Sequence, residues 1–226
     1  HRRLSILDLS SAANQPMVVN HLGLMITFNG EIYNFRQLRD ELRLAGYSFY
    51  TECDTEVLIN CYAEWGEACL EKLDGMFAFA IWDDRRKCLL MARDRLGEKP
   101  LYYYRLRDGG VVFASELTSL ILHPEIDFQI NTDALTGFLA FNYIAGDICL
   151  VEGIRKLPPA TCMTLGKNKD AGFREYWSPL SNFEQKTQFC KIDDAEEELR
   201  LLVARSVQAR MISDVPLGSF LSGGID

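Results

Sequence analysis

Four strand-like segments follow one another in the middle of this chain, and they constrain its fold more than any other feature. The apolar and aromatic runs are MFAFAIWD, CLLMAR, LYYYRL and VVFAS, and the connections between them are DRRK, DRLGEKP and RDGG. Short polar or glycine-containing connections between such runs are typical of hairpins, so the pattern predicts an antiparallel, meandering sheet. Because the runs are apolar at consecutive positions, we expect both faces of the sheet to be covered.

Two helices are predicted before these strands, after a first strand-like run, LMITFNG. In the first helix Asn34 is the expected N-cap, and Gln37 stands three residues later, as in a capping box. Its apolar face consists of Phe35, Leu38 and Leu42. The second helix is predicted to begin near Asp54, which is its expected N-cap, and its apolar face consists of Leu58, Cys61, Tyr62 and Trp65.

The composition changes after the run REYW. Residues 178–194 are polar and irregular, as in a linker between domains. A further helix is predicted from Ala195, with Asp193 or Asp194 as its cap and an apolar stripe of Leu199, Leu202, Val203, Val207 and Met211. The final run, VPLGSFLSGGID, predicts a buried strand entering a glycine loop, an order that presents backbone N–H groups to a phosphate. Taken alone, the glycine pair is more typical of an ordinary turn between a strand and a helix.

The charge and cysteine content narrow the classes of function. The chain has 24 basic and 32 acidic residues and a net charge of -8, which argues against a nucleic-acid-binding surface. It has no run of roughly 18 apolar residues and no signal-peptide pattern at its start, so we expect no membrane span and a cytoplasmic protein. The 7 cysteines include no Cys-x-x-Cys pair. We therefore expect reduced, buried thiols and no metal site.

Nearly the whole chain resembles one family. The matching segments, in order and spacing, are HRRLSILDLS, QPM, FNGEIYNFRQLRDEL, DTEVLINCYAEWG, LDGMFAFAIWD, ARDRLGEKPLYYY, FASE, KLPPA and DVPLGSFLSGGID. Together they resemble the glutamine-dependent asparagine synthetases. This family combines an N-terminal glutaminase domain with an ATP-pyrophosphatase domain whose loop has the sequence Ser-Gly-Gly-x-Asp-Ser.

The resemblance implies a domain organisation and a reaction. It implies an α+β fold, with a four-layer αββα glutaminase domain of the N-terminal-nucleophile hydrolase type over residues 1–178. Residues 179–194 would be a linker, and residues 195–226 would begin an α/β nucleotide-binding domain. Glutamine hydrolysis would release ammonia inside the protein, and aspartate activated by ATP with Mg²⁺ would take it up, giving asparagine, AMP and pyrophosphate. The resemblance is also compatible with a homodimer.

The same resemblance suggests a role for individual residues. Arg3 would bind the α-carboxylate of glutamine, for which a planar guanidinium is suited, and the backbone of residues 4–7 (Leu4, Ser5, Ile6 and Leu7) would line the pocket. Asn29 and Gly30 would form the oxyanion hole, while Glu31 would help to hold glutamine and Asp54 would bind its α-ammonium. The ATP-binding residues would be Leu221, Ser222, Gly223, Gly224 and Asp226.

The resemblance also implies that the nucleophile is missing from this chain. The family's catalytic cysteine is the first residue of the mature protein and lies ahead of the segment that matches His1. In the family its thiol attacks glutamine while its own α-amino group moves the proton. We therefore expect the 226 residues alone to have neither glutaminase nor synthetase activity. Cys53 is an unsuitable substitute because no histidine accompanies it in the sequence.

Simpler interpretations of the same residues stay open. Arg3 could be a solvated surface residue, Asn29-Gly30 an ordinary turn and Asp54 only a helix cap. The segment from Arg93 to Arg95 is expected to have a structural role in a turn between strands. Two other functions also stay open: a related amidotransferase that aminates a different acceptor, or a non-catalytic relative that keeps the fold as a scaffold. The presence of all four predicted glutamine contacts, Arg3, Asn29, Gly30 and Asp54, argues against the scaffold.

Overall fold

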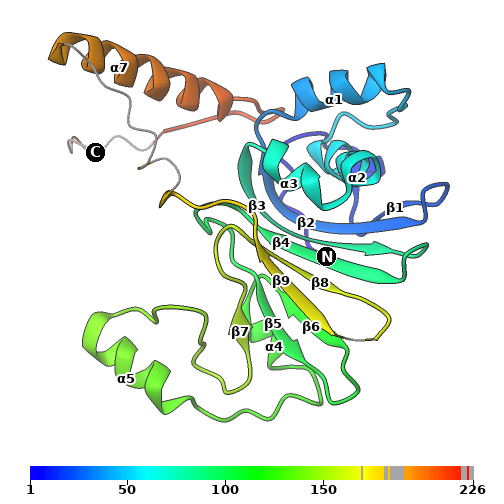
Figure 1. The fold of residues 1–226 in the computed structure, drawn as a ribbon, viewed down its shortest axis with the longest axis vertical. Coiled ribbons are helices and arrows are strands. Elements are labelled where there is room, and N and C mark those ends of the chain that lie inside the picture. Colours follow the sequence, from blue (N-terminus) through cyan, green and yellow to red (C-terminus); the bar gives the residue numbers. More distant parts are fainter. Residues whose placement is uncertain (169, 181–182, 184–190, 220–222, 224–226) are drawn as a thin grey trace.

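The computed structural model describes residues 1–168, 170–180, 183, 191–219 and 223 (Figure 1). Its strands are β1 (Met17–Val19), β2 (Leu24–Ile32), β3 (Gly75–Asp83), β4 (Cys88–Arg93), β5 (Tyr102–Arg105), β6 (Val111–Ala114), β7 (Arg155–Lys156), β8 (Thr161–Leu165) and β9 (Ala171–Glu175). Its α-helices are α1 (Phe35–Leu44), α2 (Asp54–Trp65), α3 (Cys69–Lys72), α4 (Leu117–Leu120), α5 (Thr132–Phe141) and α7 (Ile192–Ala209), with 3-10 turns at Ser11–Ala13 and Gly66–Ala68.

The strands of the described residues form two antiparallel sheets. One sheet has six strands in the order β1-β2-β3-β4-β8-β9, and the other has three in the order β6-β5-β7. The prediction of one meandering sheet was therefore wrong, because the chain leaves the first sheet after β4 and starts a second sheet with β5. A hairpin pattern identifies neighbouring strands, but it does not show where a hairpin packs.

The side chains of β3 point alternately to two covered faces of the sheet, and this explains why its sequence is apolar throughout. Phe77, Phe79 and Ile81 belong to the main core, which also includes the buried faces of α1 and α2. Ala78 and Ala80 point to the opposite side and pack with residues of the second sheet. Since both faces of β3 are covered, a run of apolar residues replaces the alternation of a half-exposed strand. The expectation that both faces are covered is confirmed.

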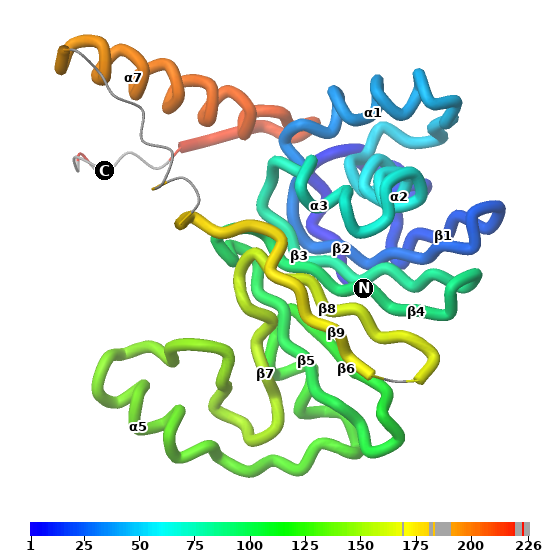
Figure 2. The backbone as a smooth tube through the Cα atoms, viewed as in Figure 1, coloured from blue at the N-terminus to red at the C-terminus, as the bar shows by residue number. Residues whose placement is uncertain are grey.

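The layers follow from these contacts. Helices α1, α2 and α3 cover one face of the six-stranded sheet, and the three-stranded sheet lies on its other side (Figures 1 and 2). The outer face of the small sheet carries Tyr102, Tyr104 and Val112, which pack in a third cluster with Leu120 of α4. The order is thus helix, sheet, sheet, helix, and the predicted α+β four-layer fold is confirmed.

Asn34 and Asp54 do not act as the predicted N-caps. Asn34 precedes α1, but its carboxamide donates to the carbonyl of Lys72 at 2.9 Å and accepts from the N–H of Asp74 at 3.0 Å. Gln37 contacts Glu41 instead of closing a capping box. Asp54 is the first residue inside α2. In both cases a partner from another element binds the polar group that a local cap would use.

The segment between β4 and β5 is held by a buried carboxylate. Asp94 is only 1% exposed, and its oxygens accept hydrogen bonds from the backbone N–H groups of Phe77, Leu96, Glu98 and Lys99 at 2.9–3.2 Å. The neighbouring Arg93 donates to backbone carbonyls in the same segment. The structural role predicted for this turn is confirmed, and the turn is the point at which the chain passes from one sheet to the other.

The C-terminal part differs from its prediction in two ways. Helix α7 begins at Ile192, three residues before the predicted start, so that Asp193 and Asp194 lie in its first turn. No residue of α7 is buried, and the predicted stripe is exposed. The predicted strand does not form over residues 215–219, where no described strand pairs with the chain. The rest of that segment, except Gly223, lies outside the described residues.

Candidate functional site

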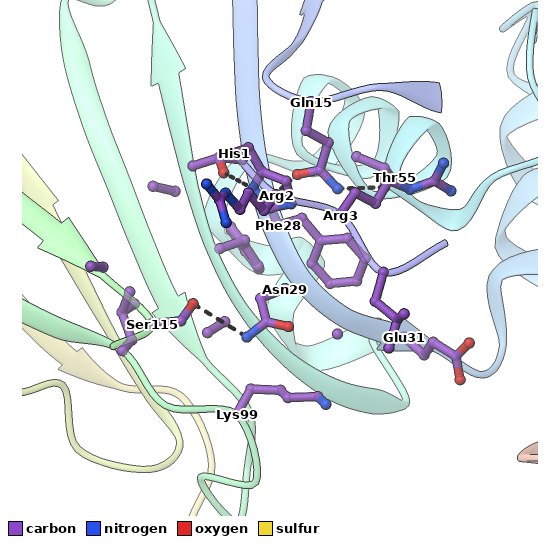
Figure 3. Close-up of a pocket in the computed structure, with 18 of the residues that line it drawn as sticks. His1, Arg2, Arg3, Gln15, Phe28, Asn29, Glu31, Thr55, Lys99 and Ser115 are labelled. Carbon is purple, nitrogen blue, oxygen red and sulfur yellow. Dashed lines mark hydrogen bonds between the residues drawn. The ribbon is translucent and has the colours of Figure 1, made fainter. Parts of the chain in front are cut away.

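A cavity of about 990 Å³ opens between the two sheets and the N-terminal segment (Figure 3). The N-terminal residues, β2, the start of α2 and the β6–α4 connection contribute to its wall. Ala78 and Ala80 face this space, and their short side chains leave room between sheets that otherwise pack about 10 Å apart. Of the residues predicted to bind glutamine, the cavity is lined by Arg3, Leu4, Ile6, Leu7, Asn29, Gly30, Glu31 and Asp54, whereas Ser5 does not line it.

Asn29 lies on β2 opposite Ala78 and projects into the cavity. Its Nδ2 donates to the Oγ of Ser115 at 3.2 Å (Figure 3). A carboxamide nitrogen carries two hydrogens, so one holds the group in place and the other is available to an acceptor in the cavity. The pair therefore forms a donor of fixed orientation, as an oxyanion hole requires.

Position 30 requires a glycine because β2 and β3 approach each other closely there. It pairs with Phe77 of β3 and has a φ of 153°. A Cβ at this position would lie 2.0 Å from the carbonyl oxygen of Met76 and 2.7 Å from the Cα of Phe77. Only glycine fits without a shift of β3, and its backbone N–H lies beside Asn29. The simple interpretation of Asn29-Gly30 as a turn is wrong, because both residues lie within β2.

Asp54 is a buried carboxylate at the start of α2. Its side chain accepts a hydrogen bond from the N–H of Ile32 at 3.0 Å, which ties α2 to the end of β2. Burial raises the pKa of Asp54 to about 6, while the N–H of Ile32, the first N–H groups of α2 and the charge of Arg3 act in the opposite direction. A carboxylate with so little solvation favours a cationic partner in the cavity.

Glu31 adds a second carboxylate on the same wall. Its Oε1 is buried and has no hydrogen-bond partner among the described residues. Burial and then the charge of Asp54 raise the pKa of Glu31, and the ammonium of Lys99 opposes them. An unpartnered buried oxygen costs about 1–3 kcal/mol, so a ligand with N–H donors would be favoured here. Two acidic groups on one wall are suited to an ammonium.

Arg3 lies on the same side of the cavity but also has partners within the protein. Its NH1 donates to the carbonyl of Asp8 at 2.9 Å, and its NH2 donates to the carbonyl of Leu7. Arg3 is half-buried, whereas the neighbouring Leu4 is 88% exposed. The guanidinium has five donors, so these two contacts orient it and leave others for a carboxylate.

Three residues of the site were not predicted individually. Gln15 accepts from the N–H of Phe28 at 2.6 Å and lies 3.5 Å from the hydroxyl of Thr55, so it joins the N-terminal segment to β2 and α2 (Figure 3). Ser115 orients Asn29, and Lys99 lines the cavity near Glu31. The signals that could have identified them are the matching segments that contain them, QPM for Gln15, FASE for Ser115 and ARDRLGEKPLYYY for Lys99.

Other predicted groups lie elsewhere or outside the described residues. Cys53 is fully buried, and burial raises the pKa of its thiol, which keeps it in the unreactive protonated form. Leu221, Ser222, Gly224 and Asp226 lie outside the described residues. In the described part of the chain no cluster of three metal-ligating side chains forms, and every helix is too short or too polar to cross a bilayer.

Residues 1–177 match the family described as glutamine amidotransferase domain. The chain belongs to this family. Residues 198–226 of this amidotransferase chain match the family described as asparagine synthase. The predicted resemblance is confirmed by these matches.

Individual relatives agree with this assignment to the family, and a solved structure agrees with the fold. The amidotransferase chain is 36% identical to asparagine synthetase [glutamine-hydrolyzing] 3 and 41% identical to asparagine synthetase [glutamine-hydrolyzing] 1 of Bacillus subtilis (strain 168). Each alignment covers 100% of this chain but 36% and 34% of the relative, so the chain spans about a third of their length. Its fold is similar to that of a glutamine phosphoribosylpyrophosphate amidotransferase from B. subtilis, with a TM-score of 0.50 and 21% identity over 74% of this chain and 33% of that one.

Proposed function

We propose that this chain is the glutamine-hydrolysing part of an ATP-dependent asparagine synthetase, together with the beginning of its synthetase domain. One observation carries the proposal: a guanidinium, a fixed carboxamide donor and a buried carboxylate, from Arg3, Asn29 and Asp54, line the same cavity. Free glutamine has three groups to recognise, an α-carboxylate, an α-ammonium and a side-chain amide, and the cavity offers a complementary group for each.

In the proposed reaction the groups of the cavity have separate tasks. Arg3 binds the α-carboxylate, while Asp54 and Glu31 bind the α-ammonium. Asn29 and the N–H of Gly30 donate to the oxygen that becomes negative when the amide carbon is attacked. The attacking thiolate belongs to the N-terminal cysteine of the family, which the resemblance places ahead of the segment matching His1. The C–N bond then breaks, ammonia leaves, and water releases glutamate from the thioester.

The second half of the proposal concerns residues 195–226, after a glutaminase domain of residues 1–178 and a linker of residues 179–194. The match to asparagine synthase supports a synthetase domain and aspartate as the acceptor. Leu221, Ser222, Gly223, Gly224 and Asp226 are the proposed contacts to ATP. Gly223 has a φ of 78°, and a Cβ added to it would meet no atom of the described residues within 4 Å, which suits a loop that approaches phosphate. ATP supplies the activation of the aspartate carboxylate, and we assign no residue of this chain to Mg²⁺.

An isotope experiment on the full-length protein tests the proposal. The protein is incubated with aspartate, ATP and glutamine that carries ¹⁵N in its side-chain amide, and the products are identified by mass spectrometry. We expect labelled asparagine, with AMP and glutamate formed in equal amounts. Transfer of the label to an acceptor other than aspartate would overturn the synthetase assignment. Absence of glutamate would overturn the glutaminase assignment.

A further inference from the structure

A hydrogen-bonded pair joins the two ends of the described chain. The backbone N–H of Asp8 donates to the Oδ2 of Asp214 at 2.7 Å, and the N–H of Asp214 donates to the carbonyl of Ile6 at 3.0 Å. Residues 6 and 8 belong to the amidotransferase match, whereas Asp214 belongs to the asparagine synthase match. Asp214 thus binds the N-terminal segment on both sides of Leu7.

Asp8 is the residue on which several contacts converge. Its φ of 50° lies in the left-handed region, which is uncommon for a residue with a side chain. Its carboxylate accepts from the N–H of Ser10 at 3.0 Å and from the N–H of Glu52 at 2.8 Å. Its backbone carbonyl accepts from Arg3 at 2.9 Å. The conformation of Asp8 therefore depends on its partners, and Asp214 binds its only backbone donor.

The contacts of Asp8 lead directly to the cavity. The guanidinium of Arg3 is oriented by the carbonyls of Leu7 and Asp8, which lie in the short segment that Asp214 holds. Ile6 and Leu7 line the cavity themselves. Loss of the Asp214 carboxylate would leave the N–H of Asp8 without its acceptor and free the two carbonyls that orient Arg3.

Asp214 is itself held by an anchored turn. Ile212 packs against the main core, and the guanidinium of Arg210 lies 4.5 Å from the ring centroid of Tyr33. The hydroxyl of Ser213 donates to the carbonyl of Val215 and accepts from its N–H. The turn after α7 is therefore fixed on the amidotransferase domain, although no residue of α7 is buried.

We propose that Asp214 is a positioning residue for glutamine: it holds residues 6–8 in the conformation that directs Arg3 toward the α-carboxylate of the substrate. The inference rests on the proposed function, because it needs glutamine as the ligand of Arg3. Asp214 stands eight positions before Ser222, the first polar residue of the proposed ATP loop. A residue of the synthetase domain thereby shapes the glutamine pocket.

The test compares steady-state kinetics of full-length variants with glutamine and with 4-aminobutanamide, which keeps the amine and the amide but lacks the carboxylate. Asp214→Ala should raise the KM for glutamine about tenfold. A change of this size is expected when glutamine binding loses the equivalent of about one charge-assisted hydrogen bond. Its KM for 4-aminobutanamide should not change. Asp214→Asn keeps an oxygen that accepts from Asp8 and should restore most of the affinity. Asp194→Ala removes an exposed carboxylate of α7 and should behave as wild type.

Three results would overturn the proposal: an unchanged KM for glutamine in Asp214→Ala, an equal rise for both substrates, or a parallel fall in the rate of asparagine formation from free ammonia. The last result would show a general effect on folding or on the ATP site. Arg3→Ala separates this inference from the proposed function. If Arg3→Ala leaves the KM for glutamine unchanged, the role of Arg3 is wrong. If only Asp214→Ala has no effect, the glutamine site stands and the positioning role is wrong.

Discussion

The carboxylate of Asp54 accepts a hydrogen bond from the N–H of Ile32 at 3.0 Å, and this contact joins the start of α2 to the end of β2. It places a buried acid beside the strand that carries Asn29, Gly30 and Glu31, so that the helix terminus and the strand form one wall of the cavity. Asp54 is 22 residues away from Ile32 in the sequence. The predicted N-cap is in this way a residue that links two elements and lines the cavity.

Replacement of Asp54 by Asn should weaken the use of glutamine and spare the use of ammonia. The substitution keeps an acceptor for Ile32 but removes the charge that would bind the α-ammonium. Loss of a charge-assisted contact of about 1.5–3 kcal/mol corresponds to a rise in KM for glutamine of roughly 10- to 150-fold. Kinetics of the full-length enzyme with each nitrogen donor measure the difference. Equal kinetics of Asp54→Asn and wild type with glutamine would restrict Asp54 to a structural role.

The same substitution should stabilise the fold at neutral pH. The pKa of Asp54 is raised from 3.8 to about 6, so the folded protein holds this proton more tightly than the unfolded chain. The contribution of Asp54 to the free energy of unfolding is fully present below pH 3.8, where the carboxyl group is protonated in both states. As the pH rises through 6 this contribution is lost, and the free energy of unfolding falls by about 3 kcal/mol. Asp54→Asn avoids this loss. Urea denaturation from about pH 4 to about pH 8 should show an advantage of the variant that grows with pH, and an advantage independent of pH would contradict the burial of an ionised carboxylate.

Replacement of Asn29 by Ala tests the oxyanion hole. In the proposed reaction the carboxamide donates to charge that develops in the transition state, so glutamine hydrolysis should slow by about 100- to 1,000-fold while binding changes less. Asparagine formation from free ammonia bypasses this step and should stay near the wild-type rate. Both rates are measured on one preparation with a normal melting curve. A parallel fall in the two rates would show that Asn29 acts only on the fold.

Replacement of Gly30 by Ala should destabilise the protein, because the added Cβ would lie 2.0 Å from the carbonyl oxygen of Met76. Overpacking against backbone costs about 1–3 kcal/mol or more, and the φ of 153° adds strain. Gly137→Ala is the matched control, since Gly137 lies in α5 and an added Cβ would have no atom within 4 Å in the part of the chain that the structure describes. The control should be stabilised by about 0.5–1 kcal/mol. The free energies of unfolding in urea compare the two, and a Gly30→Ala variant as stable as wild type would contradict the close pairing of β2 and β3.

The sequence by itself determined the features that depend on neighbouring residues. The spacing of Leu38 and Leu42 predicted the buried face of α1, and the apolar run of β3 predicted a strand covered on both sides, because a periodicity of side chains is a local property. The motifs around Arg3, Asn29 and Asp54 identified residues that line the cavity, and the resemblance suggested their roles.

Only the tertiary structure decided which partners these residues have. It divided the four strand-like runs between two sheets, turned Asn34 toward residues 72–74, and brought Ser115 to Asn29 and Asp214 to Asp8. The last two pairs are separated by 86 and 206 residues. A local pattern shows that a polar side chain needs a partner, but the partner is set by the packing of distant elements, because buried donors and acceptors are satisfied by whichever groups the fold brings within reach.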